Sequence, residues 1–437
     1  MTPAPGSRPP WSRPPWGRPR SDADRDAIEQ QDAPRRTVGV VVTHFEQPAE
    51  LARTLHALTR QTLPPDEVVV SDDGSAVPPG VPRGVRLVTQ EDRGFRAAAA
   101  RNHGVAQLGT DVVVLLDADT TPEPGLLEAL TRLPRLQPDV LVVGRRRHAD
   151  LAARPVDAPV EVAGPAHELT EPPWLRSAYA ASRDLRDADD LSCRFVISAV
   201  MACSRWWFEE LGGFDEGFTA YGGEDWELAH RSRLAGGLLA HEPAAVAWHD
   251  GPDAGERPRG VKTAETAAIA SRVGVPGLAP RGLLGLAGRP TPVDRLLATD
   301  AAFDDRALLL VCDAALRADP TAHLLLDERQ AGVLAGEPRV LRHDGDPLAA
   351  AAASPARLLV GLHRPWQLDD DAWRTLLAGA SPGVLHDAAG PVATTTELRL
   401  VRRAERWGTT PPAPATAPAP GRPLPDDLSL EAWLGDW

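Results

Sequence analysis

The sequence predicts an α/β protein whose central sheet is mostly parallel and flanked by helices. Two strand-like runs, 38–42 and 67–71, are separated by a stretch with apolar residues at helical spacing. A strand, a helix and a second strand in this order form a parallel pair with a right-handed crossover. A third run, 112–116, is apolar throughout, as in a strand buried on both faces of a sheet.

Length, composition and charge narrow the class of protein. The chain has 437 residues, enough for two to three domains, and its net charge of -14 argues against nucleic acid as a partner. Its cysteines, Cys193, Cys203 and Cys312, are odd in number and lack metal-ligand spacing, so we expect reduced thiols. No apolar run reaches about 18 residues. We therefore expect no integral membrane segment and a cytoplasmic protein, or one peripheral at the membrane.

Both ends of the chain are rich in proline. Residues 1–36 contain the repeat Arg-Pro-Pro-Trp, ending at Trp11 and again at Trp16, and have too few apolar residues for a core, so we expect disorder. This tail is either simply solvated or a basic arm that touches an anionic membrane surface or a partner domain. Residues 409–437 are expected to be a flexible Pro- and Ala-rich tail with a Trp-containing end.

Order is expected to begin at residue 37. Pro48 opens the first helix, which presents Leu51, Leu55 and Leu58 on one face. Further strands are expected over 85–88, 140–144 and 195–201, and helices over 97–108 and 174–186.

Two carboxylates, Asp117 and Asp119, directly follow the third strand. The carboxyl ends of strands in an open α/β sheet form its ligand-binding edge. Two oxygen donors on one short turn suit Mg²⁺ or Mn²⁺, which is often held by one or two carboxylates plus substrate phosphates. Asp-x-Asp alone is also common on surfaces, but its place after a buried strand favours the metal. With it, His249 at the end of an apolar strand becomes a candidate ligand, although such a histidine is usually structural.

Two arginines, and a pair of carboxylates that follows two glycines, complete the candidate site. Arg96 and Arg101 are candidate diphosphate contacts because guanidinium groups grip phosphate oxygens bidentately; the alternative is ordinary surface arginine. Paired glycines at 222–223 let the backbone approach a ligand closely, and Glu224 and Asp225 then open a helix. One of these carboxylates is a candidate general base for an acceptor hydroxyl, with plain helix capping as the alternative.

Taken together, these motifs resemble the family-2 glycosyltransferases. The residues that carry the resemblance are Thr43-His44-Phe45-Glu46, Asp72-Asp73-Gly74-Ser75, Gly94-Phe95-Arg96, Ala100-Arg101-Asn102 and Asp117-Ala118-Asp119, in the family's order and spacing. Residues 212–216 followed by 221–225 resemble the C-terminal part of galactosyltransferase-type and polypeptide N-acetylgalactosaminyltransferase-type catalytic domains. The resemblance covers about residues 37–255 and implies the GT-A fold of nucleotide-diphosphosugar transferases.

The resemblance also implies roles. A sugar would move from a nucleotide-diphosphate donor, expected to be a UDP-sugar, to an acceptor hydroxyl by an inverting single displacement. Asp225 would be the base, Glu224 would hold the acceptor or donor sugar, and Asp119, Asp117 and His249 would bind Mn²⁺ or Mg²⁺. The implied donor-nucleotide contacts are Thr43, His44, Phe45, Glu46, Asp72, Asp73, Arg96, Arg101, Asn102 and Asp117. We expect the acceptor site to be lined by residues 145–190, an insertion whose structure the sequence does not predict, together with Trp206, Trp207 and Trp226.

From about residue 256 the resemblance stops. Residues 256–295 are expected to be a linker or cover segment, and 296–408 a smaller α/β domain with strands over 307–311, 322–326, 357–361 and 397–401 and a helix over 370–378. We find no catalytic constellation there. The role of this domain is open among acceptor recognition, homo-oligomer formation and docking to a partner enzyme.

Two other functions compete with glycosyl transfer. A nucleotidyltransferase would share a similar fold and metal, but it would carry a Gly-rich basic loop directly after the first strand, which residues 43–48 lack. A non-catalytic transferase-like scaffold would be expected to have lost Asp119 or Asp225, and both are present. The acceptor stays open among glycans, lipids, small metabolites and peptides.

Overall fold

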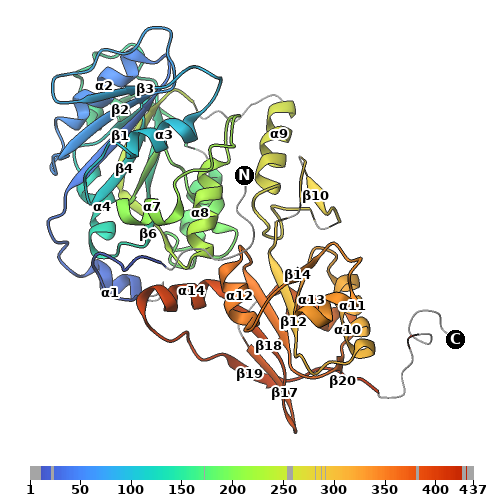
Figure 1. Cartoon of the computed structure of the whole chain (residues 1–437). Coiled ribbons are helices and arrows are strands. Elements are labelled where there is room, and N and C mark those ends of the chain that lie inside the picture. The colour runs from blue at the N-terminus through green and yellow to red at the C-terminus, as the bar shows by residue number, and fades with distance from the viewer. Residues whose placement is uncertain are drawn as a thin grey trace. The chain divides into compact units, whose positions relative to one another are not determined.

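The computed structural model describes residues 11–20, 24–171, 173–252, 259–280, 282–286, 288–290, 292–379, 383–425 and 430, which form two compact units (Figure 1). The N-terminal unit comprises residues 12–233 and 237–269. The C-terminal unit is built mainly from the residues after 269. Each unit has its own sheet and its own apolar core.

The N-terminal unit is built on one large sheet. Its strands are β1 (Val38–His44), β2 (Glu67–Asp72), β3 (Arg86–Thr89), β4 (Val112–Asp117), β5 (Thr120–Pro122), β6 (Val140–Ala149), β7 (Glu168–Leu169), β8 (Val200–Ser204) and β9 (Leu238–Asp250). The strand order is β3-β2-β1-β4-β8-β6-β9-β5, with β7 paired to β6. From β3 to β4 all neighbours are parallel, β8 is antiparallel to both of its neighbours, and β6 and β9 are parallel again. The predicted α/β class with a mostly parallel sheet is confirmed.

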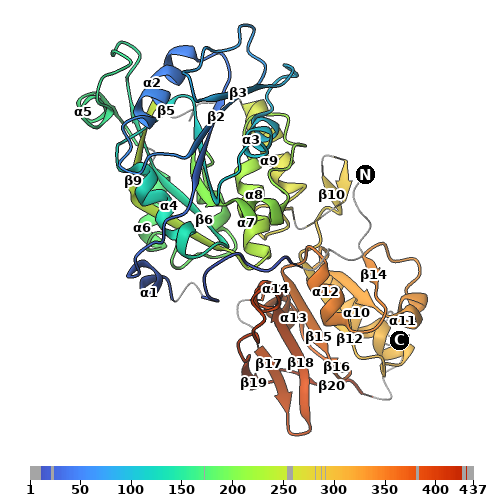
Figure 2. The same ribbon diagram turned by 60° about the vertical axis from the view of Figure 1, so that its left-hand side comes forward.

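Helices cover both faces of this sheet. They are α1 (Arg25–Glu29), α2 (Pro48–Leu58), α3 (Ala97–Val105), α4 (Leu126–Leu136), α5 (Val160–Ala166), α6 (Pro173–Ala181), α7 (Arg205–Leu211), α8 (Glu224–Leu234) and α9 (Arg259–Ala270). Leucines of α2 and α4 share one core cluster with Val40 and Val114. On the opposite face, Gly104 of α3 lies so close to Val41 that an added Cβ atom would be 2.4 Å from it. Figure 2 shows α3 beside β2 and α4 beside β6.

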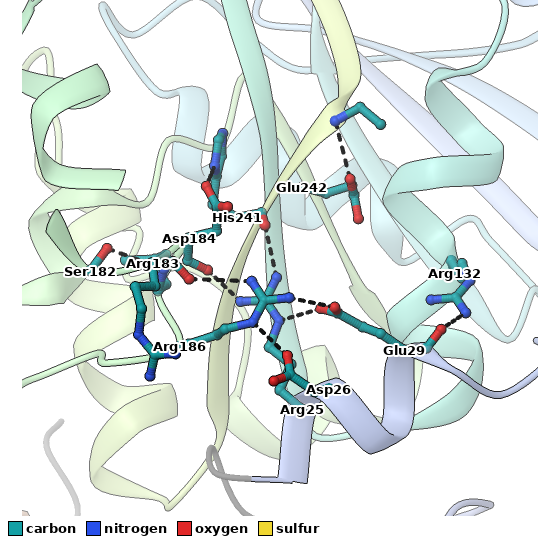
Figure 3. A network of polar contacts seen from close by, with 12 residues as sticks. Arg25, Asp26, Glu29, Arg132, Ser182, Arg183, Asp184, Arg186, His241 and Glu242 are labelled. Atoms are coloured by element: carbon teal, nitrogen blue, oxygen red, sulfur yellow. Dashed lines mark hydrogen bonds and ion pairs between the residues drawn. The ribbon is translucent and has the colours of Figure 1, made fainter. Parts of the chain in front are cut away.

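Helix α1 lies inside the segment for which the sequence predicts disorder. Its Arg25 is only 5% exposed and donates to the carbonyl oxygens of Asp184 and His241 (Figure 3). Glu29 accepts from Arg25 at 2.6 Å and from Arg186 at 2.5 Å. A buried guanidinium is tolerated when oxygens satisfy its donors. Composition does not reveal this anchor, because its carbonyl partners lie more than 150 residues away in the sequence.

The C-terminal unit has a second sheet between helices, so the predicted additional α/β domain is present. The sheet order is β14-β13-β12-β15-β18-β17-β19. Its strands are β12 (Arg295–Thr299), β13 (His323–Leu326), β14 (Val340–Arg342), β15 (Leu358–Leu362), β17 (Gly383–Asp387), β18 (Gly390–Glu397) and β19 (Ala415–Pro418). Two short pairs join β10 (Gly285–Leu286) to β11 (Arg289–Pro290) and β16 (Trp366–Gln367) to β20 (Arg422–Pro423). The helices are α10 (Asp305–Ala318), α11 (Glu328–Val333), α12 (Pro347–Ala353), α13 (Asp370–Ala378) and α14 (Leu398–Trp407).

Several predicted elements differ from the structure. The run 307–311 lies in α10, and the run 397–401 contains the last residue of β18, Glu397, and the start of α14, where strands were expected. A short apolar run does not distinguish a buried helix from a buried strand, but Asp304, whose side chain accepts from the Ala307 amide at 2.7 Å, is a helix-capping signal. The strand expected over 195–201 begins at Val200, after a 3₁₀ turn. Residues 415–418 and 422–423 form strands inside the predicted flexible tail, and α9 lies inside the predicted linker.

The three cysteines, Cys193, Cys203 and Cys312, are buried free thiols. Among the described residues, no helix has the length and apolar character needed to cross a membrane.

Candidate active site

The carboxyl ends of β1 and β4 meet at one edge of the N-terminal sheet and open onto a cavity of about 570 Å³. Of the predicted site residues, those that line it are Thr43, His44, Phe45, Asp73, Arg101, Asp117, Asp119, Glu224, Asp225 and His249. The predicted residues outside the lining are Glu46, Asp72, Arg96, Asn102, Trp206, Trp207 and Trp226. The lining also contains Gln47 and Asp92, which the sequence did not single out, Phe95 and Tyr221 from the motifs that carry the resemblance, and Arg146 from the expected acceptor segment 145–190. The sequence therefore identified the polar centre of the cavity better than its walls.

Asp72 supports the loop that follows β1 and does not line the cavity. Its Oδ1 atom lies 2.7 Å from Nδ1 of His44, and both side chains are almost fully buried. The hydroxyl of Ser75 also donates to Asp72, at 2.6 Å. Because the Gln47 amide donates to Nε2 of His44 at 3.2 Å, the imidazole proton lies on Nδ1 and is donated to Asp72. Asp72 thus fixes the loop that presents Phe45 and Gln47 to the cavity.

Glu46, Arg96 and Asn102 likewise hold loops in place. Glu46 has a positive φ of 53° and accepts from the Ala76 amide at 2.6 Å, which directs its carboxylate away from the cavity. The Arg96 amide donates to Asp73 at 2.9 Å. Asn102 donates to the Phe214 carbonyl at 3.0 Å and accepts from the Phe214 amide at 2.9 Å. The two Asn102 contacts join α3 to the loop before α8.

The predicted acceptor tryptophans lie outside the cavity. Trp207 is fully buried and donates to the Ser232 hydroxyl at 3.0 Å, so it packs α7 against α8. Trp206 donates to the Ser12 hydroxyl at 2.6 Å. The aromatic side chains that do line the cavity are Phe45, Phe95 and Tyr221, and the last two are in ring contact at 5.2 Å.

Asp119 and His249 face each other because β5 pairs with the end of β9. Thr120 is the register partner of His249, and the Asp250 amide donates to the Asp119 carbonyl at 2.9 Å. This pairing brings Oδ2 of Asp119 within 3.6 Å of Nε2 of His249. Nδ1 of His249 lies 3.2 Å from the Gly251 carbonyl, which can only accept, so Nδ1 donates its proton there and Nε2 is the ring nitrogen that faces Asp119.

This pair fits a divalent metal ion. Two ligands of one ion, each about 2.1 Å from it, lie up to about 4.2 Å apart, so a 3.6 Å separation is compatible with Mn²⁺ or Mg²⁺. Within the described part of the chain, no group of three or more His, Cys, Asp or Glu side chains is placed to hold a metal. Asp117, predicted as a further ligand, is paired with Arg101 at 2.9 Å. Asp119 and His249 are therefore two candidate ligands, a number that suits an ion completed by substrate phosphates and water.

Arg101 joins the two sides of the cavity. Its Nη2 atom contacts Asp117 at 2.9 Å and its Nη1 atom contacts Glu224 at 2.8 Å, and the residue is 4% exposed. Burial alone would lower the pKa of Arg101, but the charges of Asp117 and Glu224 raise it above its usual value. Arg101 was predicted to grip a diphosphate; in the structure its guanidinium holds two carboxylates.

Two glycines shape the loop that delivers Glu224 and Asp225. Gly222 and Gly223 have φ values of 92° and 100°, which residues other than glycine rarely adopt. An added Cβ at Gly223 would lie 2.6 Å from Ile269 of α9, so the packing also demands glycine. This tight turn places both carboxylates in the first turn of α8.

Asp225 is the carboxylate with the perturbed acidity. Burial, together with the negative charge of Glu224, raises its pKa to about 7, although Arg101 and two backbone amides, those of Ser198 and Trp226, lower it. Oε1 of Glu224 is held by Arg101, whereas Oε2 is buried without a hydrogen-bond partner. A carboxylate poised near neutral pH beside an open acceptor atom suits proton abstraction from a bound hydroxyl.

Two known families match separate parts of the chain. Residues 39–157 match the family described as glycosyl transferase family 2, and residues 190–246 match the family described as N-terminal domain of galactosyltransferase. The two matched regions contain every predicted catalytic and donor-binding residue, and they leave out only His249 of the candidate metal pair.

Individual relatives match part of the chain. A hyaluronan synthase of Pasteurella multocida is 30% identical over 49% of this chain and 24% of its own length. A validoxylamine A glucosyltransferase of Streptomyces hygroscopicus subsp. limoneus is 31% identical over 46% of this chain and 48% of its own length. The chain thus spans between a quarter and a half of these relatives. A solved structure of GalNAc-T7 with UDP, GalNAc and Mn²⁺ aligns at 17% identity and a TM-score of 0.38, covering 57% of this chain and 53% of that chain.

Proposed function

We propose that this chain is a glycosyltransferase that moves a sugar from a nucleotide-diphosphate donor to an acceptor hydroxyl with a divalent metal ion, and the family 2 match over residues 39–157 supports this proposal. One observation carries the proposal. A single cavity places the Asp119–His249 pair and the Glu224–Asp225 pair around the same space, with Arg101 between them. We propose a UDP-sugar as the donor, and a cytoplasmic location is supported by the buried free thiols.

The donor side is formed by β1, β2 and β4. Phe45 and Asp73, at the ends of β1 and β2, line the part of the cavity that we assign to the nucleoside. Asp119 and His249 would hold the metal, which when bound neutralises the charge that develops on the departing diphosphate. Gln47 donates to Oδ2 of Asp119 at 2.9 Å and keeps that carboxylate oriented toward His249.

The acceptor side is formed by the start of α8. Asp225 removes the proton of the acceptor hydroxyl while that oxygen attacks the anomeric carbon, which inverts its configuration in one displacement. The unpartnered Oε2 of Glu224 accepts a hydrogen bond from a sugar hydroxyl. Tyr221 and Phe95 provide an apolar wall for a sugar ring.

Binding of UDP tests the donor side. We expect calorimetry to show UDP binding in the presence of Mn²⁺ and at least tenfold weaker binding with EDTA or in Asp119→Ala, because the diphosphate then loses its metal bridge. The exposed Asp157 lies outside the cavity, and Asp157→Ala should bind UDP like the wild type. Equal UDP affinity with and without metal would contradict the role of the Asp119–His249 pair. A series with GDP, CDP and dTDP would then identify another nucleotide.

The pH dependence of turnover tests the acceptor side. Asp225 must be ionised to act as a base, so we expect kcat/KM to fall about tenfold per pH unit below about pH 7 and to level off above it. Initial rates of UDP release from a UDP-sugar between pH 5 and pH 9 would measure this. Glu224→Gln removes the neighbouring negative charge, so the midpoint should move to lower pH. A profile without a change between pH 5 and pH 8 would contradict the assignment.

A further inference from the structure

A second cavity, of about 400 Å³, lies at the opposite edge of the N-terminal sheet. It is lined by residues 16–18, 20, 28, 31, 32, 34 and 36, which precede β1, and by residues 135–137 at the end of α4. Strand β1 starts two residues after Arg36 and runs for seven residues toward the first cavity. A strand of that length spans about 23 Å, so the second cavity is separate from the candidate active site.

The lining of this second cavity is strongly basic. Arg18, Arg20, Arg36 and Arg135 line it together with one acidic residue, Asp32, giving a net charge of +3 in a chain whose total is -14. In the described part of the chain, Arg18, Arg36 and Arg135 form no ion pair with a carboxylate. A concentration of arginines in a concave site, three of which have no carboxylate partner among the described residues, favours anions.

The walls of the cavity are held in place by specific contacts. Trp16 donates its indole proton to the Pro134 carbonyl at 3.1 Å, and the guanidinium of Arg36 lies 4.0 Å from the centre of the Trp16 ring. Arg36 also donates to the Arg135 carbonyl at 3.2 Å.

On the other side, Arg132 donates to the carbonyls of Glu29 and Gln31, and α1 is fixed by the network of Arg25 (Figure 3). The segment that carries the arginines is therefore attached at both ends, which keeps the entropic cost of ordering a ligand site low.

The pKa of Arg135 is lowered mainly by burial of its guanidinium. Glu128 raises this pKa, whereas the nearby charges of Arg132 and Arg35 lower it. A bound anion would relieve this repulsion.

We propose that this cavity binds the phosphate groups of a compact phosphorylated compound through Arg18, Arg20 and Arg36. Guanidinium groups match phosphate oxygens bidentately, and 400 Å³ lies in the size range of small-molecule sites. The phosphate can belong to a soluble compound or to a lipid headgroup, because both present the same oxygens. The site would let a phosphorylated molecule bind at the edge of the sheet that is remote from the reaction.

Two measurements on the full chain test the proposal. Calorimetry with pyrophosphate in EDTA, which removes metal from the first cavity, measures the soluble ligand. Flotation with phosphatidylcholine vesicles, with and without phosphatidic acid, measures the lipid. Arg18→Gln/Arg20→Gln should weaken whichever binding occurs by at least about tenfold, since two charge-assisted contacts are lost. Arg83→Gln/Arg154→Gln removes the same charge from exposed positions outside the cavity and should bind like the wild type.

The outcomes separate cleanly. Pyrophosphate binding that depends on Arg18 and Arg20 supports the site and identifies a soluble ligand. Dependence in the vesicle assay alone supports the site and identifies a lipid headgroup. Absence of binding in both assays overturns the proposal, and so does an equal loss in both double variants, which would show that only overall charge matters. Unchanged unfolding temperatures in both variants confirm that they are folded.

Discussion

Replacing Asp225 with asparagine is expected to lower the rate of sugar transfer by roughly 10²–10⁴-fold, the usual contribution of a general base. The amide has nearly the same shape as the carboxylate but cannot accept the proton of the attacking hydroxyl. Because Asp225 lies at the start of α8 and not at the Asp119–His249 pair, UDP affinity should stay within about twofold of the wild type. Initial rates of UDP release, with water and with a panel of acceptors, and UDP calorimetry provide the two measurements.

Glu227→Gln is the matched control for this substitution. Glu227 lies on the same first turn of α8, is buried and pairs with Arg231 at 2.5 Å, but it does not line the cavity. Loss of this ion pair should affect stability and leave the rate nearly unchanged. If Asp225→Asn kept a wild-type rate, or if both variants lost the rate equally, Asp225 would not be the base and the acceptor half of the proposed function would fail. The donor half would be unaffected, because UDP binding tests it separately.

The sequence predicted the parts of the site that depend on local order. An all-apolar strand followed by Asp117 and Asp119, and a glycine pair before Glu224 and Asp225, fix where these carboxylates lie regardless of distant contacts. The parallel pairing of β1 with β2 also follows from the local succession of strand, helix and strand. The sequence identified His249 as a candidate metal ligand, but its position opposite Asp119 depends on the pairing of β5 with β9.

The sequence did not reveal which of two neighbouring polar residues faces the cavity. Asp72 and Asp73 are adjacent, yet one is buried against His44 and the other lines the cavity, because successive residues at a strand end point to opposite sides. Trp207 was assigned to the acceptor, but its spacing of four residues to Leu211 places both on the buried face of α7. That helical signal was available in the sequence. The basic cavity was not visible there, because it needs the folded path of a proline-rich segment.

Arg101 shows most clearly how a three-dimensional contact changes a role. Its carboxylate partners are 16 and 123 residues away, so composition around it indicates only an arginine among alanines. A guanidinium that already donates to two carboxylates has fewer donors left for a diphosphate. We therefore expect Arg101 to act as a positioning residue, which holds Asp117 and Glu224 at fixed places across the cavity and sets the charge that Asp225 experiences.

Arg101→Gln is accordingly expected to be the most destabilising substitution in the cavity. Removing one partner of a buried ion pair leaves an uncompensated charge and costs about 3 kcal/mol or more, and Glu224 is almost as buried as Arg101. For a unit of this size the unfolding temperature should fall by roughly 6–12 °C. Arg93→Gln, which breaks the exposed pair with Glu91, should change it little. Differential scanning calorimetry of both variants measures the difference.

A double variant separates a true ion pair from general damage at the position of Arg101. Glu224→Gln removes the carboxylate that Arg101→Gln leaves unpaired, so the second substitution should cost clearly less stability in the Arg101→Gln background than in the wild type. Without Arg101, a positive charge that lowers the pKa of Asp225 is also lost, so the pH midpoint of turnover in Arg101→Gln should rise. Additive losses together with an unchanged midpoint would contradict the positioning role, and Arg101 would then return to its predicted place as a contact of the donor diphosphate.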